Sequence, residues 1–147
     1  MFDQTLDILL IEDDPHDVEL TLHAFQKHAV VPRVHVIKNG AEALEFFHRT
    51  GPYAHRDPEQ GPKLILLDLK LPMVDGLYVM RQIRSSSSHR TTPVVVLSSS
   101  SDEPDLIKSY QLGINSYIVK PVDSDAFIDT AHMIVQYWLS LNRAPAA

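Results

Sequence analysis

The chain contains no cysteine among its 147 residues. Disulfide bonds, thiolate zinc sites and thiol catalysis are therefore excluded. It also lacks a basic surplus, because 13 lysines and arginines stand against 19 aspartates and glutamates, for a formal net charge of −6. A surface that binds nucleic acid normally carries a basic patch, so we expect no nucleic-acid partner.

Long apolar runs are missing as well. No run approaches the roughly 20 apolar residues of a membrane-spanning helix, and the first residues, 1–7, contain Asp3 and Asp7 and do not form a signal peptide. We therefore expect a cytoplasmic protein without membrane contact. The length suits one domain, 1–147, with its core over about 7–141 and no output domain.

What the sequence does contain is a regular alternation of short apolar runs and amphipathic segments. The runs are rich in Val, Ile and Leu, as in strands buried on both faces, and lie at 8–11, 34–37, 64–67, 94–97 and 117–119. Segments with helical periodicity follow at about 17–28, 41–49, 77–85, 103–112 and 124–141. This alternation predicts an α/β fold with a five-stranded, doubly wound parallel sheet.

One connection departs from this regularity. The segment 50–62 is polar, holds three prolines and two glycines, and is long for a link between a helix and a strand. We expect an exposed insertion there, with a partner-binding loop as the alternative. The eight histidines form no metal-binding pair. Only His16 lies near the acidic run 12–14, and we expect the others on helix surfaces or in loops without a catalytic role.

Acidic residues follow two of the predicted strands. Asp68 comes directly after 64–67, and Glu12, Asp13 and Asp14 come directly after 8–11. Open parallel sheets hold their ligands at the carboxyl ends of the strands, and neighbouring carboxylates there suit Mg²⁺. The alternative for the run 12–14 is capping of the following helix, a role that we assign to Asp14. The pattern predicts a Mg²⁺ site whose aspartate could accept a phosphoryl group.

Four motifs in order resemble the receiver domains of two-component response regulators. Each follows a predicted strand: Glu12-Asp13, Asp68, Ser98 and Lys120-Pro121. The stretch 68–76, DLKLPMVDG, is similar to the acceptor loop of that family. The resemblance covers about 7–141 and implies a flavodoxin-like, CheY-like (βα)5 fold.

Narrower features resemble the stand-alone regulators that partner bacterial and cyanobacterial phytochromes. They are the glutamate at position 12, the long loop before the third strand, and the Tyr137-Trp138-Leu139 ending of the last helix. The resemblance implies a histidine kinase partner, and more narrowly a phytochrome.

The resemblance also implies roles for individual residues. Asp68 would accept the phosphoryl group from a kinase histidine, Lys120 would neutralise its charge, and Ser98 would donate its hydroxyl to a phosphoryl oxygen. Tyr117 would be the aromatic residue that changes position on phosphorylation; the alternative is an ordinary tyrosine at the sheet edge.

The expected ligands of Mg²⁺ are the carboxylates of Glu12, Asp13 and Asp68 and the backbone carbonyl of Lys70. Lys70 departs from the Asn or Met that is commoner in the family, and we expect it to alter the dephosphorylation rate. The family resemblance also implies a cis bond between Lys120 and Pro121.

These expectations together describe a phosphoprotein rather than an enzyme with a separate substrate. It would assist its own Mg²⁺-dependent phosphotransfer and dephosphorylation and would signal by protein–protein contact. Two apolar stripes on the segment 124–141 suggest a homodimer through the fourth helix, fifth strand and fifth helix. The simpler interpretation of the second stripe, Ile128, Val135 and Leu139, is a wide core-facing surface.

Three other functions compete with this one. A pseudo-receiver scaffold that is never phosphorylated would not need Asp13, Asp68, Ser98 and Lys120 together. A flavodoxin-like cofactor binder would need a phosphate-binding loop where the acidic run 12–14 stands. A hydrolase with Asp68 as nucleophile would need elements that cover the substrate, and only 50–62 is available.

Overall fold

The computed structural model describes residues 6–145, and it contains the predicted parallel sheet. The strands lie in the order β2-β1-β3-β4-β5, and every neighbouring pair is parallel. Their bounds agree closely with the apolar runs: β1 Ile8–Ile11, β2 Val34–Ile37, β3 Leu64–Leu67, β4 Val94–Ser98 and β5 Ser116–Val119. The prediction of a doubly wound α/β fold is confirmed.

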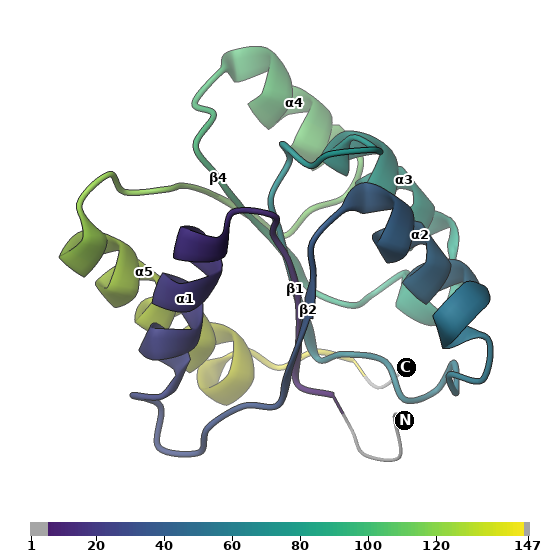
Figure 1. Cartoon of the computed structure of the whole chain (residues 1–147), viewed down its shortest axis with the longest axis horizontal. Helices are drawn as coiled ribbons and strands as arrows, with labels where there is room; N and C mark the ends of the chain where they lie inside the picture. The colour runs from purple at the N-terminus through teal and green to yellow at the C-terminus, as the bar shows by residue number, and fades with distance from the viewer. Residues whose placement is uncertain (1–5, 146–147) are drawn as a thin grey trace.

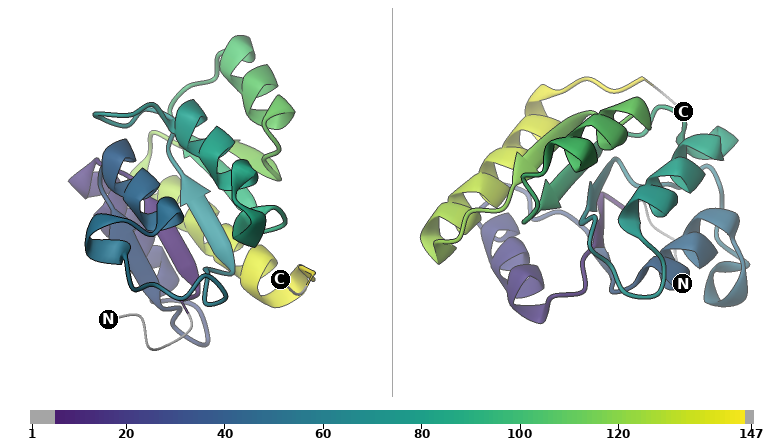
Figure 2. Two further views of the ribbon diagram at one scale, coloured as in Figure 1. Left: turned by 90° about the vertical axis from the view of Figure 1, so that its right-hand side faces the viewer. Right: turned by 90° about the horizontal axis from the view of Figure 1, so that it is seen from above.

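Helices cover both faces of this sheet (Figures 1 and 2). They are α1 Pro15–Phe25, α2 Gly40–His48, α3 Gly76–Ser85, α4 Glu103–Gln111 and α5 Ser124–Gln136. One face carries α1 and α5, which pack on each other, and the other carries α2 and α3. The last helix was expected to reach 141, but its α-helical part ends at Gln136 and a π-helical turn, η3 Tyr137–Leu141, follows.

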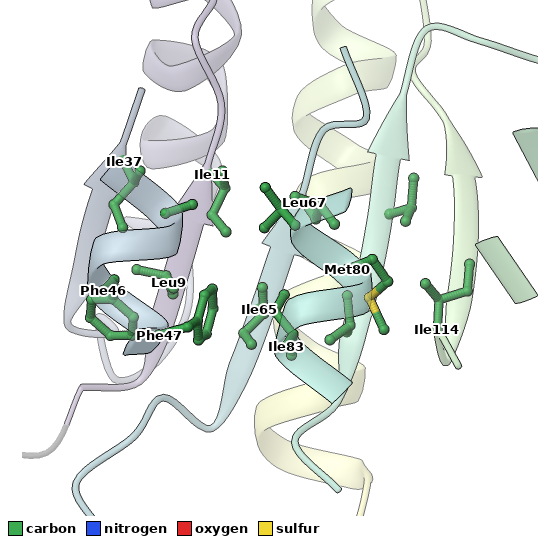
Figure 3. Close-up of a cluster of buried hydrophobic side chains, with 14 of the residues drawn as sticks. Leu9, Ile11, Ile37, Phe46, Phe47, Ile65, Leu67, Met80, Ile83 and Ile114 are labelled. Carbon is green, nitrogen blue, oxygen red and sulfur yellow. The ribbon is translucent and has the colours of Figure 1, made fainter. Parts of the chain in front are cut away.

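The central strands β1, β3 and β4 are apolar up to their last residue because the sheet has a hydrophobic core on each side. Alternate strand residues, among them Leu9, Ile65 and Val96, meet side chains of α2 and α3 (Figure 3). The residues between them meet α1 and α5. All four residues of β1 and of β3 are buried, which explains why these strands show no alternation of polar and apolar residues.

The loop that follows β3 is held tightly between two helix starts. A Cβ atom on Gly40 would lie 2.0 Å from the carbonyl oxygen of Val74, and one on Gly76 would lie 2.6 Å from the Cα of Leu69. The Gly40 N–H also donates to the carbonyl of Pro72, at 3.2 Å. Two glycines thus let the backbone after Asp68 lie directly against α2 and α3.

The segment 50–62 is exposed over most of its length, as its polar sequence predicted, but it is also attached to the core. It contains a short 3-10 helix, η1 Gly51–Tyr53, and it buries Tyr53 and Arg56. The Tyr53 hydroxyl donates to the Glu42 carboxylate at 2.6 Å and lies 2.7 Å from the ring nitrogen of His35. The sequence did not predict these two attachments, because polar side chains can be buried when neighbouring elements satisfy them.

Arg56 is the second attachment of this segment. Its guanidinium stacks 4.0 Å from the centroid of the Phe46 ring and donates to the Phe46 carbonyl at 3.1 Å. It also lies 3.3 Å from the Nε2 of His89, which is 1% exposed in the 3-10 helix η2 Ser87–His89. His89 thus lies in the connection between α3 and β4, as expected, but it is buried. The expectation that the histidines other than His16 lie on helix surfaces or in loops is wrong for His35, which lies in β2. We call Tyr53, Arg56 and His89 the segment anchor.

None of the helices within 6–145 has both the length and the apolar character needed to cross a membrane.

Candidate functional site

The parallel register brings the predicted acidic residues together at the carboxyl edge of the sheet. Ile11 of β1 pairs with Leu67 of β3, so that Glu12 and Asp68, the next residue of each strand, lie side by side. The backbone continues the pairing, because the Asp68 N–H donates to the Ile11 carbonyl at 3.0 Å. The location of both residues is as the sequence predicted.

Three carboxylates converge at this point. Glu12, Asp13 and Asp68 each offer a ligand oxygen, and these oxygens all lie within 4.8 Å of one another. Glu12 is 3% exposed and Asp68 7%, whereas Asp13 is open to solvent. Hard anionic oxygens around a point that water can reach are the donor set of Mg²⁺, which retains several of its own waters. The residues present fit that ion.

Lys120 enters the same cluster from the end of β5. Its Nζ lies 2.6 Å from a Glu12 oxygen, 2.8 Å from an Asp17 oxygen and 3.1 Å from an Asp68 oxygen. Its backbone N–H donates to the Ser98 carbonyl at 2.7 Å, which ties the lysine to the end of β4. The structure therefore confirms that Lys120 lies beside Asp68.

Asp17 is the site residue that the sequence did not reveal. It lies in the first turn of α1, which starts at the same edge of the sheet. Asp14 caps that helix as predicted, with Oδ1 accepting from the N–H groups of His16 and Asp17. The available signal was the position of Asp17 one turn after a strand end that already carried carboxylates.

The charge imbalance of the cluster affects its protonation. Burial, together with the hydrogen bond and the charge of Asp68, raises the pKa of Glu12 to about 8 despite the nearby ammonium. Burial alone would lower the pKa of Lys120, but hydrogen bonds to Asp17 and Glu12 and the charge of Asp68 raise it above its usual range. One ammonium thus serves more carboxylates than it can neutralise, which favours binding of a further cation.

Ser98 and Tyr117 both contact the loop that follows β4. Ser98 is completely buried at the end of β4, and its hydroxyl accepts from the Ser100 N–H at 3.2 Å. The Tyr117 hydroxyl donates to the Ser100 carbonyl at 2.8 Å. Ser98 lies at the predicted edge of the sheet, and Tyr117 is linked to the same loop through its hydroxyl. Their roles in phosphorylation stay predictions.

The residues around the acceptor loop match the expectations in part. Lys70 is exposed, and its N–H donates to Asp68 Oδ1 at 3.2 Å, while the role of its carbonyl as a metal ligand stays a prediction. No peptide bond within 6–145 is cis, so the expected cis bond between Lys120 and Pro121 is wrong for this structure.

Part of the second apolar stripe of α5 faces the core of the protein. Val135 is completely buried, and Leu139 packs partly buried on the same core, so these two residues of the second stripe face the protein interior. Four other apolar side chains are at least about half exposed on or beside α4 and β5: Ile107, Tyr110, Val119 and Val122.

Comparison with known proteins agrees with this architecture. The model of the response regulator receiver domain family matches residues 8–132. Response regulator Rcp1 of Synechocystis is 33% identical over 140 residues, which cover 95% of this chain and 93% of Rcp1. The Mn²⁺-bound structure of Rcp1 superimposes with a TM-score of 0.88 at 32% identity, covering 96% and 99% of the two chains.

Two further solved structures are similar over nearly the whole chain. The phosphorylated cyanobacterial phytochrome response regulator RcpA has a TM-score of 0.89 and 35% identity, with 97% of this chain and 99% of RcpA covered. The bacteriophytochrome response regulator RtBRR has a TM-score of 0.74 and 45% identity, with 97% and 85% covered.

Proposed function

This chain belongs to the response regulator receiver domain family, and we propose that it accepts a phosphoryl group on Asp68 from a histidine kinase. The observation that supports this most is the position of the Asp68 carboxylate. It is almost fully buried, lies 3.1 Å from the Lys120 ammonium, and shares a cluster of ligand oxygens with Glu12 and Asp13. A structural aspartate would not need both a cation and two further carboxylates around it.

The proposed reaction moves one phosphoryl group between two side chains. A carboxylate oxygen of Asp68 attacks the phosphorus of a phosphohistidine, an O–P bond forms, and the P–N bond breaks. The imidazole nitrogen leaves with the electron pair and then takes a proton from water. Lys120 donates N–H groups to the phosphoryl oxygens, because the transferring group spreads negative charge over them.

A bound Mg²⁺ would be held by Glu12, Asp13 and Asp68 and would neutralise further charge on the phosphoryl oxygens. Three carboxylates contact one ammonium and a fourth, that of Asp13, lies in the same oxygen cluster, so the chain itself lacks enough positive charge to stabilise an added phosphoryl group. In the separate dephosphorylation step, water would attack the phosphorus, the aspartyl O–P bond would break with the electrons left on the carboxylate, and phosphate would be released. The protein would act on itself in both steps and would not be an enzyme with a separate substrate.

The proposed partner is a histidine kinase of the phytochrome class. The support is similarity over nearly the whole chain to RcpA and RtBRR, which are described as phytochrome response regulators. The proposed setting is the cytoplasm, with signalling by protein contact and without nucleic-acid or membrane binding.

We place the proposed homodimer on α4, β5 and α5. Ile107 and Tyr110 lie one turn apart on α4, and Val119 ends β5, and all three are about half exposed. Apolar side chains grouped on one face in this way favour a self-complementary contact. Ile107→Glu should lower the dimer fraction in sedimentation, whereas a wholly monomeric wild-type protein with and without acetyl phosphate would contradict the dimer.

The acceptor function is tested by intact mass after incubation with acetyl phosphate. The wild-type protein should gain one phosphoryl group with Mg²⁺ and should gain none when the ion is chelated. Asp68→Asn, which has nearly the same shape, should gain none in either condition. A folded wild-type protein that is never labelled would favour the scaffold function.

The partner is tested by competition among autophosphorylated kinases. A phytochrome-class kinase should transfer its phosphoryl group to this protein faster than unrelated histidine kinases do at equal concentration. Equal or slower transfer from the phytochrome-class kinase would contradict the partner while leaving the acceptor function intact.

A further inference from the structure

Asp17 is the third carboxylate on the Lys120 ammonium, and it lies outside the motifs that mark the site. Its Oδ2 is 2.8 Å from Nζ, closer than the 3.1 Å that separates Nζ from Asp68. The side chain of Asp17 is 19% exposed and that of Lys120 only 9%. This ion pair joins the first turn of α1 to the end of β5, and its two residues lie 103 positions apart in the sequence.

The start of α1 holds Asp17 in this position. Asp14 accepts the first free N–H groups of the helix, so the Asp17 carboxylate is not needed as a cap. The Thr21 hydroxyl donates to the Asp17 carbonyl at 2.7 Å and is itself buried. With the cap supplied by Asp14, the Asp17 carboxylate is available to Lys120 and accepts from its ammonium.

An ammonium group has three N–H donors, and three carboxylates already take those of Lys120. A phosphoryl group on Asp68 would bring three more acceptor oxygens and about −1.5 to −2 charges to the same place. It must draw on the same ammonium. Any carboxylate that continues to accept an N–H of Lys120 reduces the number of hydrogen bonds that the ammonium can donate to the phosphoryl group.

We propose that Asp17 is a positioning residue of the phosphotransfer reaction, which draws the Lys120 ammonium toward α1 and competes with the phosphoryl group for its N–H donors. The inference rests on the proposed function, because it takes Asp68 as the acceptor. Asp17 differs in this respect from Glu12, which contributes to the metal ligand set as well. Its carboxylate slows phosphorylation of the protein while leaving the acceptor intact.

The test is the second-order rate constant for phosphorylation by acetyl phosphate with saturating Mg²⁺, followed by intact mass. In this reaction an Asp68 oxygen bonds to phosphorus, and acetate leaves with the electrons of the broken O–P bond. Asp17→Asn removes the competing charge and should raise the rate constant roughly two- to fivefold, the size expected of one partly exposed ion pair. Asp17→Ser should act in the same direction, and Asp17→Glu should restore a rate near that of the wild type.

Asp14→Asn is the matched control. It removes one carboxylate from the start of the same helix and keeps an oxygen that can cap α1. The ion pairs of Lys120 are with Glu12, Asp17 and Asp68 and do not include Asp14. The rate constant of Asp14→Asn should equal that of the wild type. Thermal unfolding of each variant shows that the fold is retained.

Two results would overturn the inference while the wild-type protein is still labelled. The first is a rate constant of Asp17→Asn and Asp17→Ser that equals or falls below the wild-type value. The second is an equal acceleration by Asp14→Asn, which would assign the effect to the general negative field. If the wild-type protein itself takes no label, the proposed function fails and the inference fails with it.

Discussion

Two buried cations of this protein have opposite electrostatic surroundings. Lys120 at the carboxyl edge of the sheet contacts three carboxylates, whereas Arg56 in the segment anchor contacts a carbonyl, a neutral histidine and an aromatic ring. Burial, together with the charge of Arg49, lowers the pKa of Arg56 to about 10 although Asp57 opposes the shift, while hydrogen bonds to Asp17 and Glu12 and the charge of Asp68 raise that of Lys120. The first cluster has an excess of negative charge that a metal ion and a phosphoryl group can use; the second has no such excess.

The difference in surroundings indicates a role in the reaction for Lys120 and a structural role for Arg56. A buried charge with neutral hydrogen-bond partners stabilises one conformation of a segment and offers nothing for a ligand to neutralise. We therefore expect substitutions at the edge of the sheet to change the reaction and substitutions in the segment anchor to change stability.

The largest expected effect is on the rate of phosphorylation, which should depend on Lys120 and not on Arg56. Lys120→Met should lower the rate of phosphorylation by acetyl phosphate by roughly 100-fold or more, because a preorganised donor to the developing charge is lost. Arg56→Met should leave that rate unchanged. Intact-mass time courses at one Mg²⁺ concentration measure both, and a similar loss in the two variants would remove the distinction.

The next effect is on stability, which should depend on Arg56. Arg56→Ala should lower the free energy of unfolding by about 2–4 kcal/mol, since it removes a buried side chain together with its hydrogen bond to the Phe46 carbonyl and its contact with the Phe46 ring. Arg56→Met should cost less, because it fills more of the space. Urea unfolding measures both, with exposed Lys63→Ala as the control. A loss below about 1 kcal/mol for Arg56→Ala would show that the segment is not held by this residue.

A third effect concerns pH. Burial, with the charges of Arg56 and Arg84, lowers the pKa of His89 from 6.5 to about 4, so the folded protein keeps this ring neutral. Between pH 6.5 and 4 the unfolded chain binds the proton more readily, and stability falls as the pH falls through this window. The loss should approach about 3 kcal/mol near pH 4.

His89→Gln should flatten that dependence, and His55→Gln, at an exposed position of the segment 50–62, should not. Urea unfolding at intervals from pH 7 to pH 4 measures the difference. An identical slope for the wild type and His89→Gln would contradict the assignment of this proton to His89.

The smallest effect comes from the other end of the segment anchor. Tyr53→Phe removes the hydroxyl that donates to Glu42 and contacts His35, and should cost about 1–2 kcal/mol of unfolding free energy. Phosphorylation should proceed at the wild-type rate. Stability unchanged within error would mean that water replaces the hydroxyl without loss.

The sequence predicted the sheet well because strands buried on both faces leave continuous apolar runs, such as that of β3. It also located Glu12, Asp13, Asp68 and Lys120, since the ends of parallel strands meet at one edge. It missed contacts that depend on side-chain direction across elements. Asp17 reaches Lys120 from a helix turn, and Arg56 is buried on an aromatic ring in a segment of polar composition.

The charge excess at the edge of the sheet should make Asp68 the phosphoacceptor. The most direct test of this assignment is to label the protein with acetyl phosphate and Mg²⁺, reduce the acyl phosphate with borohydride, and sequence the peptides by mass spectrometry. We predict homoserine at position 68 and nowhere else. Homoserine at position 13, or a phosphoryl group retained on a histidine with Asp68 unchanged, would contradict the assignment.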